Sequence, residues 1–201
     1  RPVNLGPEIN SPAWESQPSL SADGRMLYFI SDRKGGLGKR DIYISEMVEE
    51  GVWSRARNAG PGINTSDDEV SPFIHVNGRT LFFSSRGYPG FGGFDIYYSN
   101  RIGSKWSTPT NIGYPINDHD DQVSMFITTD GSSAYYSYEV EDDAGKRSLL
   151  YMFVFPEEEV IARGSNYLTG IITDAVTEER LEARVEMYNL DDKRLINAFT
   201  S

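Results

Sequence analysis

An internal repeat of 53 to 54 residues constrains the fold of this chain more than any other feature. It aligns four sets of positions: Gly24, Gly78 and Gly131; Asn10, Asn64 and Asn117, each after an isoleucine; Asp41-Ile-Tyr43 and Asp95-Ile-Tyr97; and Trp53 and Trp106. Chance does not align so many positions at one period. The repeat is therefore a structural unit that recurs along the chain.

Each unit predicts a small set of antiparallel strands. In the first unit, residues 17–20 form a predicted strand, and Asp23-Gly24 is a hairpin turn in which glycine supplies the positive φ. The apolar run 26–31 predicts a strand covered on both faces. A glycine-rich loop leads to a third strand at 41–45, and a more polar outer strand is expected around Trp53. Four-stranded antiparallel units of this kind are typical of β-propeller blades.

The repeat is incomplete at its start and altered in its third unit. Residues 2–10 match 59–64 and 112–117, so they are the tail of an earlier unit. Three units cannot close a ring that usually holds about four to eight blades. We therefore expect further blades upstream or assembly with another chain. The third unit lacks the Gly-Gly loop and the Asp-Ile-Tyr triplet, as a terminal repeat often does.

The repeat ends at Phe155, where Pro156 and an acidic run indicate a boundary. We expect propeller blades over 1–156, a linker over 157–166 and the start of a β-sandwich over 167–201. The strands expected in that last part are 168–172, 184–188 and 195–199, with a turn at 174–178. The predicted fold class is all-β: propeller blades followed by a partial β-sandwich.

The composition excludes several classes of function. The 30 acidic and 19 basic residues give a formal net charge of −11, which repels nucleic acid and anionic lipid headgroups. The chain has no cysteine, which excludes a disulfide framework, a thiolate zinc site and a cysteine nucleophile. No apolar stretch is long enough to span a bilayer. We expect no nucleic-acid partner and no direct membrane span.

The glycine-rich and acidic motifs favour structural roles. The loops 35–38 and 90–93 resemble phosphate cradles, but a strand follows each of them where a phosphate loop needs a helix. The acidic segments 66–69 and 118–121 match no calcium-loop spacing, so no metal site is predicted. Carboxylates that recur in the first two units, such as Asp41 and Asp95, are expected to accept hydrogen bonds from nearby backbone amides.

No catalytic residue and no cofactor site are predicted. His75 and His119 hold different positions in their units, and no serine elbow accompanies them. The repeating arginines Arg33 and Arg86 are expected to pair with acids between blades.

Aromatic side chains are the best candidates for contacts with a partner or a glycan. Trp53 and Trp106 recur with the period, which favours packing inside each unit. The candidate contact residues are Trp14, Tyr88, Phe91 and Tyr138. Trp14 stands outside the repeat, and Tyr138 begins the part of the third unit where the pattern changes.

The segment 23–33, Asp-Gly-Arg-Met-Leu-Tyr-Phe-Ile-Ser-Asp-Arg, resembles the PD40, or WD40-like, repeat related to the propeller of TolB. With Ile-Asn before it and Gly-Gly and Asp-Ile-Tyr after it, the pattern is similar to OmpA-family envelope proteins of Bacteroidetes. The segment 169–185 resembles a carboxypeptidase regulatory-like domain, with Thr177-Glu178 where that domain usually has Thr-Gly. The order of these two parts resembles PorE-like proteins.

The resemblance implies a non-catalytic scaffold in the periplasm, associated with the outer membrane. Its implied partners are envelope proteins, including components of the type IX secretion system, and peptidoglycan through a domain outside this chain. A carbohydrate-binding module is the alternative, with Trp14, Tyr88 and Phe91 stacking on sugar rings. An enzyme is the third possibility, but the chain lacks nucleophile, base and metal signatures.

Overall fold

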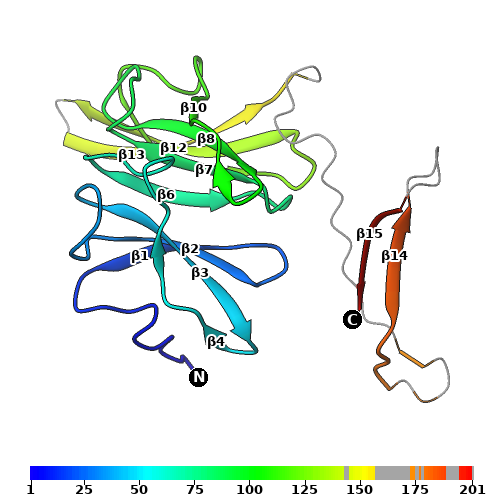
Figure 1. Cartoon of the computed structure of the whole chain (residues 1–201). Helices are drawn as coiled ribbons and strands as arrows, with labels where there is room; N and C mark the ends of the chain where they lie inside the picture. Colours follow the sequence, from blue (N-terminus) through cyan, green and yellow to red (C-terminus); the bar gives the residue numbers. More distant parts are fainter. Residues whose placement is uncertain (143–144, 157–172, 175–176, 178, 189–194, 201) are drawn as a thin grey trace. The chain divides into compact units, whose positions relative to one another are not determined.

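The computed structural model describes residues 1–142, 145–156, 173–174, 177, 179–188 and 195–200 (Figure 1). These residues form strands and loops and contain no helix, which confirms the all-β prediction. It follows that no helix in the described part of the chain could cross a membrane. The chain divides into two compact units, Arg1–Tyr167 and Leu168–Ser201. The predicted linker 157–166 and the expected strand 168–172 lie outside the described residues.

The first repeat unit forms one antiparallel sheet, which we call sheet I. Its strands are β1 (Glu15–Leu20), β2 (Met26–Ser31), β3 (Asp41–Glu49), β4 (Val52–Trp53) and β5 (Arg57–Asn58). Strands β1, β2 and β3 follow one another as a meander. Strand β4 pairs with the end of β3, and β5 pairs with its beginning.

The second unit repeats this arrangement as sheet II. Its strands are β6 (Glu69–Ile74), β7 (Thr80–Ser85), β8 (Asp95–Ile102), β9 (Lys105–Trp106) and β10 (Thr110–Asn111). The strand expected around each tryptophan is present as β4 and β9, but the expected total of four strands is wrong, because a further short strand, β5 or β10, also pairs with the long strand. The chain turns tightly at Gly51 and Gly103, both with positive φ, and pairs twice with the preceding long strand.

The third unit forms sheet III from β11 (Asp121–Ile127), β12 (Ser133–Asp142) and β13 (Gly145–Val154). Its register shows that this unit keeps more of the repeat than its sequence suggests. Leu150 and Tyr151 lie opposite β12 just as Ile42 and Tyr43 lie opposite β2. Leu149 therefore replaces the aspartate of the Asp-Ile-Tyr triplet. Among the described strands, none pairs with the outer edge of β13.

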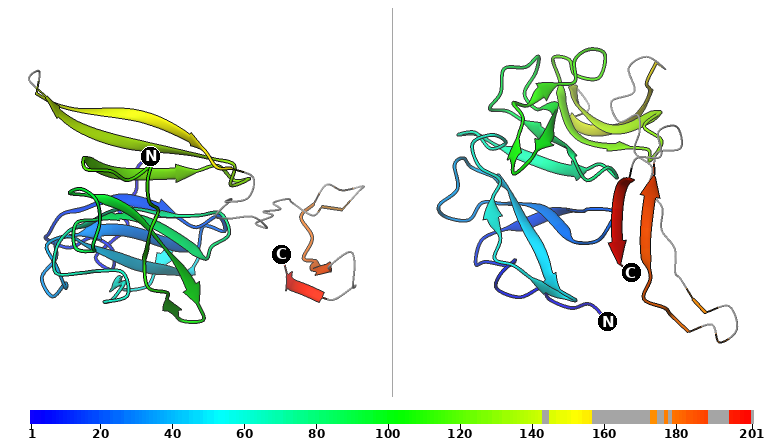
Figure 2. Two further views of the ribbon diagram at one scale, coloured as in Figure 1. Left: turned by 90° about the horizontal axis from the view of Figure 1, so that it is seen from above. Right: turned by 45° about the vertical axis from the view of Figure 1, so that its right-hand side comes forward.

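Sheet II lies between sheets I and III and shares a core with each (Figures 1 and 2). Strands β2 and β7 are buried along nearly their whole length, which confirms that these apolar runs are covered on both faces. The core between sheets I and II contains Tyr28 and Ile44 from one sheet and Leu81 and Phe83 from the other. Burial of this continuous apolar surface holds neighbouring units together.

The first strand of each unit carries a β-bulge. Gln17 and Ser71 have φ of 51°, a conformation that is uncommon for residues other than glycine. Each precedes a proline, which disfavours the right-handed helical region for the residue before it. Gln17 Oε1 accepts a hydrogen bond from the Ser71 amide at 2.6 Å, and Ser19 Oγ accepts one from the Ile74 amide at 3.1 Å. Side chains of β1 therefore bridge to β6.

The second compact unit contains a two-stranded antiparallel sheet, β14 (Arg184–Tyr188) and β15 (Leu195–Thr200). These strands confirm the expectations for 184–188 and 195–199. An isolated antiparallel bridge also joins Thr173 to Arg180.

Candidate functional site

The equivalent strands β1, β6 and β11 border a groove of about 720 Å³ on the first compact unit. Small hydroxyl and amide side chains supply much of its lining. Those residues are Gln17, Ser19, Ser71, Ser124, Ser137 and Ser148. The prolines that follow the first two bulges, Pro18 and Pro72, also face the groove. The sequence repeat predicts equivalent strands, but it does not predict that their bulged segments converge on one concave surface.

Basic side chains line this groove although the chain is acidic overall. Arg40 pairs with Asp68 at 2.7 Å, which joins the first unit to the second. Arg86 pairs with Asp121 at 2.9 Å, and its guanidinium lies 4.2 Å from the centroid of the Phe94 ring. The predicted pairing between units is therefore confirmed for Arg86.

The other repeating arginine behaves differently. Arg33 pairs with Glu15 at 3.1 Å within sheet I, so the prediction of a pair between units is wrong for it. Its guanidinium lies over the ring of Tyr43, 4.6 Å from the centroid. The sequence also did not single out Arg40, because this arginine has no counterpart at the same position in the other units.

A buried carboxylate stands at the start of β6. Glu69 accepts hydrogen bonds from the Thr65 amide at 2.8 Å, from Thr65 Oγ1 at 2.7 Å and from Ser85 Oγ at 2.7 Å. Glu15 accepts the equivalent bonds from Ser11 and Ser31, which confirms a repeated structural role. Burial raises the pKa of Glu69 above its ordinary value despite these hydrogen bonds. The third unit has Gln122 here, which carries no charge.

Replacing Glu69 with glutamine is expected to change how stability depends on pH. The pKa of Glu69 is higher in the folded state than in the unfolded state. Its contribution to the free energy of unfolding is therefore fully present below pH 4.5 and is lost as the pH rises through the pKa of the folded state. Glu69→Gln removes that loss. The free energy of unfolding, measured by urea titration from pH 4 to 8, should decline less above pH 4.5 in this variant than in the unchanged protein.

Glu15→Gln is the matched control at the equivalent position. Burial raises the pKa of Glu15, but hydrogen bonds from Ser11 and Ser31 and the charge of Arg33 hold it below its ordinary value. The stability that Glu15 contributes is therefore present above its unfolded pKa and is lost on acidification. Glu15→Gln should therefore change how the free energy of unfolding falls on acidification. Identical profiles for the two variants would contradict the assignment.

The glycine-rich loops are built around aspartates, as predicted. Asp41 accepts hydrogen bonds from the amides of Leu37 and Gly38. Asp95 accepts the equivalent bonds from Phe91 and Gly92. A Cβ on Gly38 would collide with the Asp67 carbonyl, and one on Gly92 with the Asp120 carbonyl. These glycines therefore let each loop pack against the backbone that begins the next unit.

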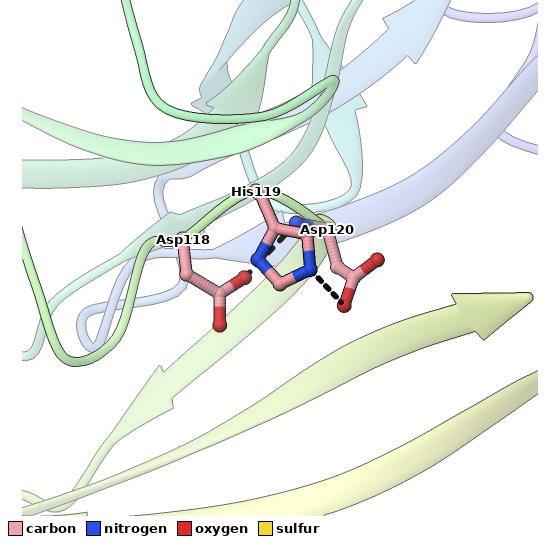
Figure 3. A group of neighbouring side chains, drawn as sticks. All are labelled: Asp118, His119 and Asp120. Atoms are coloured by element: carbon pink, nitrogen blue, oxygen red, sulfur yellow. Dashed lines mark hydrogen bonds and ion pairs between the residues drawn. The ribbon is translucent and has the colours of Figure 1, made fainter.

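Figure 3 shows the acidic cluster Asp118, His119 and Asp120 before β11. Their potential ligand atoms lie within 4.8 Å of one another. The two carboxylates already accept hydrogen bonds from the Tyr138 hydroxyl, each at 2.8 Å, and His119 is exposed. Asp118 also accepts hydrogen bonds from Gln122 and from the Asp120 amide. The arrangement is that of a hydrogen-bonded loop.

The four aromatic candidates occupy different environments. Trp14 is 51% exposed and Phe91 is 59% exposed, so both present ring surface to solvent. Tyr88 packs against Phe83 and Tyr97 and donates a hydrogen bond to the Ile63 carbonyl. Burial raises the pKa of Tyr88 to about 12.

Tyr138 is held by its hydroxyl and by its ring. Burial and then the hydrogen bonds to Asp118 and Asp120 raise its pKa well above its ordinary value. Its ring packs against Tyr151. In the described part of the chain, no ring contact joins any two of Trp14, Tyr88, Phe91 and Tyr138. Of the four residues, Trp14 and Phe91 present the most surface to solvent.

His75 lies buried at the end of β6. Its Nδ1 accepts a hydrogen bond from the Asn77 amide at 3.3 Å. Burial lowers the pKa of His75. The equivalent residues Ser21 and Thr128 also interact with the turn that follows, so this histidine holds a turn in place.

The fold and the groove define a class of protein: an all-β protein built from repeated antiparallel sheets, with a polar groove along the equivalent first strands. Comparison with models of known protein families found no match to this chain, and comparison with curated proteins found none either. Its function is therefore argued from the fold and the groove.

Proposed function

We propose that this chain is part of a non-catalytic β-propeller scaffold that binds other proteins. Two observations support the propeller fold. Sheets I and II repeat the same strand order and register, and each successive pair of sheets shares a buried core. The first strands β1, β6 and β11 converge on one groove, as the inner strands of blades do around a propeller axis.

The groove is the observation that carries the binding role. It brings hydroxyl, amide and arginine side chains from all three units to one concave surface. The repeated acidic side chains, in contrast, are engaged in hydrogen bonds to backbone amides and hydroxyls, which supports a structural use for them. Recognition by shape and hydrogen bonding suits such a surface.

The resemblance of the repeats supplies the cellular context of the proposal. The protein would work in the periplasm of a Gram-negative cell, next to the outer membrane, as part of a PorE-like, OmpA-family protein. Its partners would be envelope proteins, including type IX secretion components, with peptidoglycan bound by a domain outside this chain. The pair β14–β15 would belong to a β-sandwich of the carboxypeptidase regulatory-like type.

The test is capture of partners from an envelope fraction by the immobilised chain. Ser148 is exposed on β13 and lines the groove, so Ser148→Arg should fill part of the groove without disturbing the core. Specific captured proteins should fall at least tenfold with this variant. Val48→Arg, at an exposed position of β3 that is absent from the groove lining, should capture them normally. Equal capture by both variants would overturn the assignment to the groove.

A second candidate function is glycan binding. The hydroxyl-rich groove and the exposed ring of Trp14 favour it, because sugar rings are bound by hydrogen bonds and by stacking on aromatic faces. Calorimetric titration of soluble peptidoglycan fragments into the chain should then give heat that Trp14→Ala abolishes. No heat with the unchanged chain would exclude this candidate.

A further inference from the structure

The groove along β1, β6 and β11 is lined by more cationic than anionic side chains, although the whole chain has a formal net charge of −11. Arg40, Arg86 and Lys146 line it, and Glu139 supplies the one carboxylate among the residues of its lining. A concave surface lined mainly by one sign of charge raises the local concentration of ligands of the opposite sign. The groove therefore favours an anionic group.

Both arginines are held by carboxylates that are more buried than the guanidinium groups. Arg40 Nε donates to Asp68 at 2.7 Å, and Arg86 Nη2 donates to Asp121 at 2.9 Å. The Asp68 side chain is 10% exposed, against 34% for Arg40. The Asp121 side chain is 17% exposed, against 41% for Arg86. It follows that the arginines, rather than the acids that pair with them, present the larger surface to solvent.

The guanidinium groups keep donors to spare. A guanidinium carries five N–H donors, and each ion pair uses one nitrogen of its arginine. In the part of the chain that the structure describes, neither guanidinium makes a further hydrogen bond. The ring of Phe94 also lies against the Arg86 guanidinium, which restricts the orientation of that group. The remaining donors are thus positioned before a ligand arrives, which lowers the ordering cost of binding.

Two further side chains of the groove supply unused donors. Lys146 is exposed on β13 and forms no ion pair with any described residue. The Oε1 atom of Gln17 accepts a hydrogen bond from the Ser71 amide, whereas its Nε2 group has no partner among the described residues. Unused donors therefore outnumber unused charged acceptors in this lining. A ligand that satisfies them brings acceptor oxygens.

An adjoining recess of about 320 Å³ limits the negative charge that the groove accepts. Four acidic residues contribute to its lining: Asp120, Asp121, Glu139 and Glu141. Arg86 and Lys146 line both the recess and the groove. A polyanion held by these two cations would place its other charges near the acids of the recess, where like charges repel. The arrangement favours a ligand group with a single negative charge.

We propose that the groove binds an extended segment of a partner protein through one carboxylate, which Arg40, Arg86 and Lys146 hold. The hydroxyl and amide side chains of the groove would bond to the main chain of that segment, because each peptide unit offers a carbonyl acceptor and an amide donor. The carboxylate belongs either to an acidic side chain of the partner or to its C-terminus.

This carboxylate site lies within the three described sheets. Arg40 joins sheet I to sheet II, Arg86 joins sheet II to the start of sheet III, and Lys146 belongs to sheet III. The carboxylate site rests on the protein-binding role proposed above and adds the chemistry of the partner to it.

The first test is fluorescence anisotropy with rhodamine-labelled hexapeptides of alanine and serine, added to the full chain at low salt. One peptide has a free C-terminal carboxylate, a second has one internal glutamate and a C-terminal amide, and a neutral amidated peptide is the control. We expect at least one charged peptide to bind at least tenfold more tightly than the neutral one, which also identifies the source of the carboxylate. If neither charged peptide binds more tightly than the neutral one at chain concentrations up to about 1 mM, the proposal is wrong.

Lys146→Glu is the variant that tests the site, because Lys146 takes no part in the two ion pairs between units. The charge reversal should weaken binding of the charged peptide at least fivefold. Lys105→Glu makes the same change at an exposed position of β9 outside the groove, and should alter the dissociation constant less than twofold. Equal weakening by the two variants would show that net charge, rather than the groove, attracts the peptide, and would overturn the proposal.

Two comparisons separate this inference from its alternatives. Inorganic phosphate should displace the charged peptide no better than sodium chloride of the same ionic strength, and stronger displacement by phosphate would overturn the assignment to a carboxylate. Ser148→Arg fills part of the groove, whereas Lys146→Glu changes its charge and leaves it open. Partner capture that falls with Ser148→Arg but not with Lys146→Glu would support the scaffold function and overturn the carboxylate site.

Discussion

Replacing Asn64 with alanine is expected to destabilise the first compact unit by about 3 kcal/mol. The Asn64 side chain is buried between the connector and β3, where it bonds to the amide and carbonyl of Ile42 and to Asn58 Oδ1 at 2.8 Å. The Ile42 carbonyl would keep the hydrogen bond from the Ala59 amide. The Ile42 amide would lose its Asn64 acceptor in a buried place, which carries the largest cost. Chemical denaturation followed by tryptophan fluorescence measures the effect.

Asn10→Ala is the matched control for this prediction. Asn10 occupies the same position of the repeat, but its side chain bonds only to the exposed Asn4 among the hydrogen bonds of the described residues. In dilute solution we expect Asn10→Ala to lower the free energy of unfolding by less than about 1 kcal/mol. Equal losses for Asn10→Ala and Asn64→Ala would show that bracketing the neighbouring strand contributes nothing beyond the local turn.

Phe82→Ala is the second substitution with a large expected effect: it should lower the free energy of unfolding by about 3 to 5 kcal/mol. Phe82 is fully buried in the core between sheets II and III, against Phe73 and Tyr98. Removing the ring takes away its transfer free energy and leaves a cavity between two sheets. Phe82→Leu, which fills most of that space, should cost less than about 1.5 kcal/mol. Urea titration of the three proteins gives the comparison.

Tyr135→Ala separates this core effect from the intrinsic preference of an aromatic residue for a strand. Tyr135 holds the position of Phe82 in the next unit but is 47% exposed. We expect a loss below about 1 kcal/mol in dilute solution, since little buried surface is removed. A loss as large as that of Phe82→Ala would contradict the arrangement in which Tyr135 has no covering sheet among the described residues.

Local patterns predicted the strands well because their signals are local. Met26–Ser31 was predicted at its observed bounds, since an unbroken apolar run beside an Asp-Gly turn defines a strand buried on both faces. The turn roles of the glycine loops were also predicted correctly, because repetition of an aspartate at the same offset indicates a backbone contact rather than chemistry.

The predictions that went wrong concern pairings between distant segments. The outer strand proved to be two, because the chain beyond the long third strand returns twice to different parts of it. Arg33 pairs within its own sheet, whereas Arg86 reaches the next unit, although the two looked alike in the sequence. The contacts of Tyr88 with Phe83 and Tyr97 were not predicted either, since its place in a loop does not indicate which side chains pack against the ring.

By itself, the sequence determined that this protein is a repeat of short antiparallel strands with structural carboxylates at fixed offsets, because a repeat and a turn signal can be recognised from residue types and their spacing alone. The tertiary structure alone decided that the bulged first strands meet at a polar groove, that Leu150 stands where Ile42 and Ile96 stand, and that the face of sheet III is exposed. These properties depend on strand register and on which sheet faces which. Both are set by packing between residues that lie far apart in the chain.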